Sequence, residues 1–160
     1  MLELLDAGAD FSAIGPGGLS PLALAARCEC PEAASLFLEK GAQPNAPCSP
    51  GCSPLYEAMR RNDARTVRLL VAAGADVNEN VKGFSLLELA LASLNASLVE
   101  QLIEGGAQKA GRRAEIFYDT SEKIICGLGD HYGLRFGVGK STGDFEAVID
   151  VLRRYDHVAS

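Results

Sequence analysis

The sequence predicts a mainly α-helical repeat solenoid followed by a small α+β extension. One observation is a Gly-Ala dipeptide that recurs at spacings of 33, 33 and 32 residues and closes an apolar stretch each time. A Gly-x-Ser motif recurs in phase with it, and alternating polarity begins after about residue 108. A fixed period near 33 residues is typical of arrays whose units bury their apolar faces against their neighbours. The dipeptides are Gly8-Ala9, Gly41-Ala42, Gly74-Ala75 and Gly106-Ala107.

Length and composition exclude several classes of protein. A chain of 160 residues has room for one domain, or for an array with a small appendage. A net charge of -6 argues against a nucleic-acid-binding protein, which would carry a basic patch. No apolar run approaches the roughly 18 residues of a membrane span. We therefore expect neither a nucleic acid nor a membrane as partner.

The N-terminal residues and the cysteines favour a reducing compartment. The first residues, Met-Leu-Glu-Leu-Leu-Asp, lack the basic region of a secretory signal. Five cysteines is an odd number, and no pattern indicates disulfide pairing. We expect reduced thiols and a cytoplasmic location.

The two registers divide residues 1–108 into units. A half repeat over 1–12 comes first, and full repeats follow at about 13–45, 46–78 and 79–108. Ser20 and Ser53 suit helix N-caps, and the prolines after them suit the first helical position, where an absent N–H is not missed. A short apolar helix follows in each unit, then a second helix, which ends at the Gly of Gly-Ala as the left-handed C′ residue.

Segment 74–78, Gly-Ala-Asp-Val-Asn, together with the Ser-Pro-Leu openings at Ser20 and Ser53, resembles the ankyrin repeat over residues 1 to about 108. The resemblance implies paired antiparallel helices and a non-enzymatic protein-binding function. Three departures concern the family's His, which is replaced by Ala23, Tyr56 and Glu88, and the third unit also has Leu86 instead of Pro. We expect the side-chain hydrogen bond of that His to be absent from all three units.

In the ankyrin family the partner usually lies in the concave face, built from the hairpin tips and the exposed side of the first helices. The resemblance implies that this face is formed here by apolar residues of the hairpins and arginines of the helices. Apolar anchors beside Arg are typical of binding hot spots, and the basic stripe in an acidic chain indicates a partner segment with Asp or Glu. The predicted partner-binding residues are Leu19, Arg27, Cys52, Arg60, Arg61 and Phe84.

The half repeat at the start leaves a second function open. An array normally ends in a polar cap, whereas residues 1–12 supply only one helix. This helix is either a stub cap or is covered by another chain. The alternative to a binding module is therefore a homo-oligomeric structural or adaptor protein, with a homodimer through this edge.

Residues 109–160 predict a different structure, a three-stranded antiparallel β-meander and one helix. Segments 115–118, 123–126 and 132–136 are rich in β-branched and aromatic residues. A helix from about Gly143 places Phe145, Val148, Ile149 and Leu152 on one side. So small a unit needs support, and we expect it to pack on the last repeat as a cap.

The motifs that suggest chemistry are incomplete. Gly139, Lys140, Ser141 and Thr142 resemble the end of a phosphate-binding loop, but Leu134 stands where that motif requires Gly. Nucleotide or anion binding at this helix start is the third candidate function. Cys28 and Cys30 are separated by a helix from Cys48 and Cys52, so we expect no zinc site. Cys126 with His131 fits a strand thiol and a turn His better than a catalytic pair. We expect no enzyme activity, no cofactor and no metal.

Overall fold

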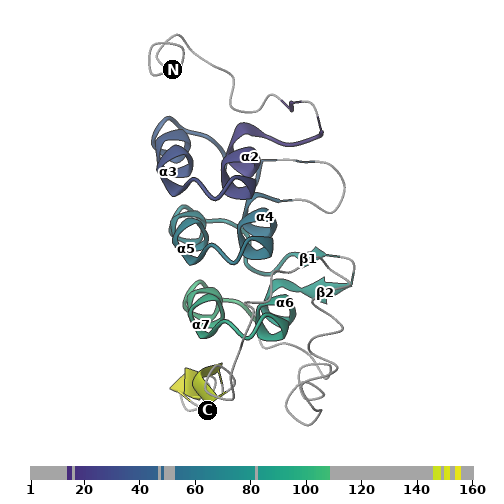
Figure 1. The fold of residues 1–160 in the computed structure, drawn as a ribbon, viewed down its shortest axis with the longest axis vertical. Helices are drawn as coiled ribbons and strands as arrows, with labels where there is room; N and C mark the ends of the chain where they lie inside the picture. Colours follow the sequence, from purple (N-terminus) through teal and green to yellow (C-terminus); the bar gives the residue numbers. More distant parts are fainter. Residues whose placement is uncertain are drawn as a thin grey trace.

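The structure is a computed structural model that describes residues 14–15, 17–46, 48, 53–81, 83–108, 146–148, 150–151 and 154–155. Its repeat region is a stack of three helix pairs (Figure 1). The inner helices are α2 (Pro21–Arg27), α4 (Pro54–Arg60) and α6 (Leu86–Ala92), and the outer helices are α3 (Pro31–Glu39), α5 (Ala64–Ala72) and α7 (Ala96–Glu104). The predicted solenoid of paired helices is confirmed for this region.

The inner helices begin at serine caps, as predicted. The hydroxyl of Ser20 accepts from the amide of Ala23 at 3.2 Å, and that of Ser53 accepts from Tyr56 at 2.9 Å. A proline follows each serine at the first helical position. These caps satisfy amides that have no partner within the helix, and so they set where each unit starts.

The Gly of each Gly-Ala dipeptide ends an outer helix in the left-handed conformation. Gly41, Gly74 and Gly106 have φ values of 91°, 87° and 89°. After α5, the amide of Gly74 donates to Val71 and that of Ala75 donates to Leu70, both at 3.0 Å. This is the Schellman arrangement, which pairs the last carbonyls of a helix and favours Gly at C′. The same pair of bonds follows α3 and α7.

The turns between inner and outer helices repeat this geometry without glycine. Glu29, Asn62 and Leu94 have φ values of 57°, 59° and 50°. The amide of Glu29 donates to Ala26 at 3.2 Å, as a C′ residue does. Asn adopts this conformation readily, whereas Glu and Leu do not. The turns at Glu29 and Leu94 therefore carry a local strain that glycine would avoid.

Two asparagines connect neighbouring units. The side chain of Asn45 donates to the carbonyl of Gly74 at 3.1 Å and accepts from the amide of Asp76 at 2.8 Å. One unit later, Asn78 donates to Gly106 at 3.3 Å and accepts from Gln108 at 2.7 Å. Each asparagine thereby bridges to the end of the following outer helix, and we call this paired bond the asparagine clasp.

A single core runs between the two columns of helices. Its fully buried side chains include Leu22, Leu55, Leu70, Leu89 and Leu102, one or more from every described unit. The third unit opens with an antiparallel hairpin of β1 (Asn80–Val81) and β2 (Phe84–Ser85), in which Val81 pairs with Phe84. Figure 1 shows this hairpin on the side of α4 and α6 that faces away from α5 and α7.

The third unit corrects one expectation from the sequence. Glu88, at the position of the family's His, does make side-chain hydrogen bonds. Its carboxylate accepts from the amide of Ser85 at 2.8 Å and from its hydroxyl at 3.1 Å, while Ser85 caps the amide of Glu88. This reciprocal capping box compensates for Leu86, which lacks the fixed φ of proline.

The half repeat over 1–12, the meander segments 115–118, 123–126 and 132–136, and most of the remaining C-terminal piece lie outside the described residues. The described residues between 146 and 155 are helical. Val148 and Val151 there are each 3% exposed and belong to the core. Phe145, Ile149 and Leu152 lie outside the described residues.

Candidate functional site

The predicted partner-binding residues that the structure describes fall at the two ends of the inner helices. Arg27 and Arg60 are the last residues of α2 and α4, and Arg61 follows as the C-cap of α4. Phe84 lies in the hairpin that leads into the other end of α6. An inner helix has seven residues, so the arginines and Phe84 lie about 10 Å apart along the helix axis. We call these four residues the inner-helix face.

Arg60 is held by its own helix. Its Nη1 lies 3.3 Å from both carboxylate oxygens of Glu57, and its guanidinium lies 5.9 Å from the centre of the Tyr56 ring. Glu57 is 5% exposed, so this buried carboxylate needs the cation beside it. The positive charge of Arg60 is therefore largely neutralised within α4.

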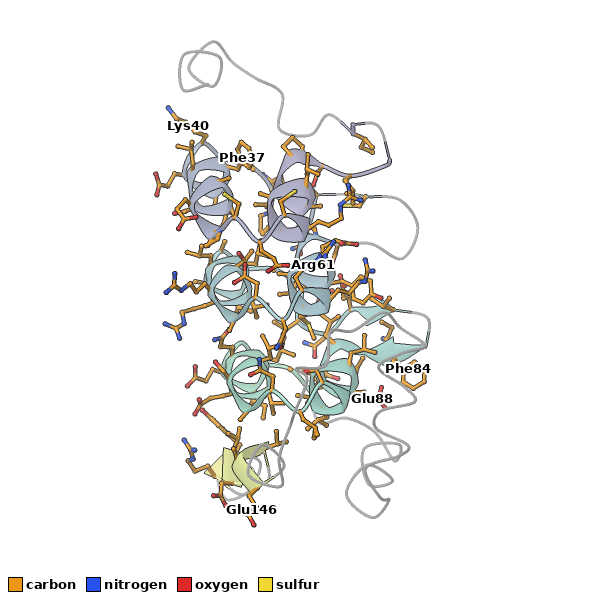
Figure 2. All side chains as sticks on the ribbon, in the orientation of Figure 1. Phe37, Lys40, Arg61, Phe84, Glu88 and Glu146 are labelled. Carbon is orange, nitrogen blue, oxygen red and sulfur yellow. The ribbon has the colours of Figure 1, made fainter. Side chains whose placement is uncertain are left out.

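Arg61 differs from Arg60 in having no such partner. It is half-buried at the turn between α4 and α5 (Figure 2). Within the described part of the chain, its Nε atom is buried without a hydrogen-bond partner and its guanidinium has no ion pair. A carboxylate from another molecule would pair with the charge of this guanidinium group. Arg27, also half-buried, has no ion pair among the described residues either.

The apolar part of the predicted site is smaller than the sequence indicated. Leu19 is only 6% exposed and belongs to the core, so it offers a partner little surface. Phe84 is half-buried and packs partly against the core. Cys52 lies outside the described residues. Of the three predicted apolar residues, Phe84 is the one the structure describes at the surface (Figure 2).

The sequence analysis missed an exposed apolar side chain on α2. Leu24 is 45% exposed, although it belongs to the apolar run of this helix. The corresponding positions of the next units are Glu57 and Leu89, which are 5% and 2% exposed. The repeat register could have predicted this exposure, because the first full unit has no described unit before it to cover this position. Ile14 nearby in the sequence is 54% exposed.

A carboxylate in the hairpin region has a perturbed ionisation. The hydroxyl of Ser53 donates to Glu79 Oε1 at 2.6 Å. Burial raises the pKa of Glu79 above its ordinary 4.5; the bond from Ser53 opposes this rise, and the nearby Asp76 charge adds to it. The serine that caps α4 is thereby also tied to the strand side of the next unit.

The cysteines described do not form a metal site. Cys28 and Cys30 flank the turn after α2, whereas Cys48 Sγ lies 3.8 Å from the hydroxyl of Ser20 at the start of that helix. The two groups thus lie at opposite ends of α2. Across the described ranges, no three His, Cys, Asp or Glu side chains form a cluster suited to a metal. Gly139, Lys140, Ser141, Thr142, Cys126 and His131 lie outside the described residues.

No helix in the described part of the chain is both long and apolar enough to cross a lipid bilayer.

Comparison with known proteins extends the structural assignment. A family model described as ankyrin repeats, in three copies, matches residues 22–113. The chain is 38% identical over 92 residues to the B-cell lymphoma 3 protein homolog of Mus musculus, covering 56% of this chain and 20% of that protein. It is 40% identical over 108 residues to the neurogenic locus notch homolog protein 4 of Homo sapiens, covering 65% of this chain and 5% of that protein.

The chain thus spans a fifth or less of the length of these relatives. The matched segment covers more than half of the chain and contains every helix from α3 to α7. The repeat period, the paired helices and this match agree, and the chain belongs to the ankyrin-repeat family.

Proposed function

We propose that this chain is a non-enzymatic protein-binding module whose partner contacts the inner-helix face. Arg61 is the observation that carries the proposal, because its charge is unpaired among the described residues and suits an acidic side chain of a partner. Phe84 supplies an apolar contact at the other end of the inner helices, and ankyrin repeats are generally protein-interaction modules. Arg60, already paired with Glu57, contributes mainly shape.

The experiment compares matched arginine variants of the full chain. Immobilised wild-type chain captures partners from a lysate of its source cell, and the retained protein is identified by mass spectrometry. Arg61→Glu should lose the partner, whereas Arg65→Glu on the outer helix α5 should keep it. Retention of the same partner by both Arg61→Glu and Phe84→Asp, with normal circular dichroism, would exclude the inner-helix face.

A second candidate is self-association through the start of the stack. Leu24 and Ile14, at 45% and 54% exposed, favour it because large apolar side chains at one end of an array suit another chain. Sedimentation velocity over a range of concentrations tests it. A homodimer that Leu24→Lys converts to a monomer would support this function, and a strict monomer at every concentration would reject it.

We further propose that segment 109–160 caps the third unit. Arg154 Nη1 lies 3.0 Å from Glu100 Oε1, and the hydroxyl of Tyr155 donates to Glu104 at 3.1 Å. These contacts join α7 to the helical residues near the end of the chain, whose Val148 and Val151 are buried. Removal of residues 109–160 should lower the melting temperature and expose apolar surface to a hydrophobic dye; an unchanged melting temperature would contradict the cap.

A further inference from the structure

A groove on the outer side of the stack lies between α5 and α7. It encloses about 570 Å³, and its walls come from both helices. The α5 wall consists of Arg68, Val71 and Ala72, and the α7 wall consists of Ser97, Glu100, Gln101, Glu104 and Gly105. This groove is separate from the inner-helix face.

Gln101 is a buried polar side chain in the wall of this groove. It is 7% exposed, and its Nε2 donates to the hydroxyl of Ser97 at 3.2 Å. Its Oε1 is buried and has no hydrogen-bond partner among the residues that the structure describes. An unpaired buried carbonyl oxygen is costly, and the group that satisfies it must be a hydrogen-bond donor.

The repeat register shows that the third unit is exceptional at this position. The residues equivalent to Gln101 in the first two units are Leu36 and Leu69, so a leucine fits the fold there. The charge beside it also differs between units, because Arg68 of α5 corresponds to Glu100 of α7. The third unit thus carries a polar residue in this wall where the other two carry leucine.

The charges of the α7 wall select the kind of donor. Glu100 and Glu104 lie on the same wall as Gln101, and both already accept hydrogen bonds from donors, Arg154 and Tyr155. Arg68 on the facing wall is exposed and has no ion pair among the described residues. The charge of Glu100 is paired with Arg154, whereas Tyr155 is neutral, so the carboxylate of Glu104 favours a cation toward α7 and Arg68 favours an anion toward α5.

We propose that this groove binds a segment of a partner polypeptide that presents a basic side chain beside an acidic one. On binding, the Gln101 side chain turns so that Oε1 faces the groove and accepts from the basic group, which lies against the carboxylate of Glu104. The acidic neighbour pairs with Arg68. Gly105 keeps the end of the groove narrow, because a Cβ there would come within 2.6 Å of Val71 Cγ1.

The test uses three pools of fluorescein-labelled nonapeptides with the full chain. The central residue is Lys, norleucine or Glu, and the flanking positions are degenerate and include acidic residues. Fluorescence anisotropy should show the Lys pool binding roughly tenfold more tightly than the norleucine pool, because a bond to a charged donor is worth about that factor. Equal binding of these two pools, or tighter binding of the Glu pool, would overturn the proposal.

Two variants assign the preference to the α7 wall. Gln101→Leu restores the residue of the other units, so its melting temperature should be unchanged or higher while the Lys preference falls to within about twofold. Glu104→Gln, at an exposed position, should weaken Lys binding without affecting folding. Glu39→Gln on α3 is the matched control and should bind as wild type. A Lys preference that survives in both groove variants would show that the groove is not the site.

Discussion

Replacing Glu29 by glycine should stabilise the array. Glu29 is exposed, and its φ of 57° places it in the left-handed region at the turn between α2 and α3. That conformation costs an L-residue about 1–2 kcal/mol relative to glycine. Glycine also gives the unfolded chain more conformational freedom, which offsets roughly 0.5–1 kcal/mol of this gain. We expect a net gain of about 0.5–1 kcal/mol.

Urea and thermal unfolding monitored by circular dichroism measure this gain. A gain of that size raises the melting temperature of a chain of this length by roughly 1–4 °C. Arg65→Gly is the matched control, because Arg65 is exposed within α5 and glycine there should cost about 0.8–1 kcal/mol. Leu94→Gly should gain less than Glu29→Gly, since Leu94 packs against the core. If Glu29→Gly destabilises the chain as much as Arg65→Gly, backbone strain at this turn is not what limits stability.

Three further changes test other contacts. Raising the pH should reduce the stability of wild type relative to Glu79→Gln. The pKa of Glu79 is raised in the folded state, so its protonated form stabilises the fold. This stabilisation is full below about pH 4.5 and is lost as the pH rises through the folded-state pKa. Urea unfolding between pH 4 and 7 measures this difference, and a constant one would argue against it. Asn78→Ala should cost about 1–2 kcal/mol through two lost hydrogen bonds, against little change for the exposed Asn80→Ala. Glu88→Ala should cost about 1 kcal/mol of unfolding free energy, and Glu88→Gln much less, because Gln can still complete the capping box. Equal losses of unfolding free energy in the two variants would show that the capping box adds nothing.

The parts of the fold that depend on local chemistry were predictable from the sequence. Ser20 and Ser53 as caps and the left-handed glycines follow from backbone rules that act within a few residues. The positive φ values of Glu29 and Leu94 were not predicted, because neither residue type favours a positive φ. The packing of two helices imposes this conformation. The hydrogen bonds of Glu88 were not predicted, because the absence of the family's His implied that no side chain bonds to this serine.

The candidate site was less predictable, because exposure depends on contacts between units. The register placed Leu19 on the binding face, yet tertiary packing buries it. The pairing of Arg60 with Glu57 follows from their spacing of three on a helix and could have been anticipated. Gln101 was recognisable only by comparing the three units column by column, where it replaces two leucines.

The asparagine clasp makes the array extensible. Asn45 reaches from one unit to the end of the next outer helix, and Asn78 makes the equivalent reach one unit later. Excision of residues 46–78 would place Asn45 directly before the third unit, where Gly106 and Gln108 offer the groups that Asn78 now engages. These two bonds are therefore the same at both junctions, so they would survive a change of chain length by whole units.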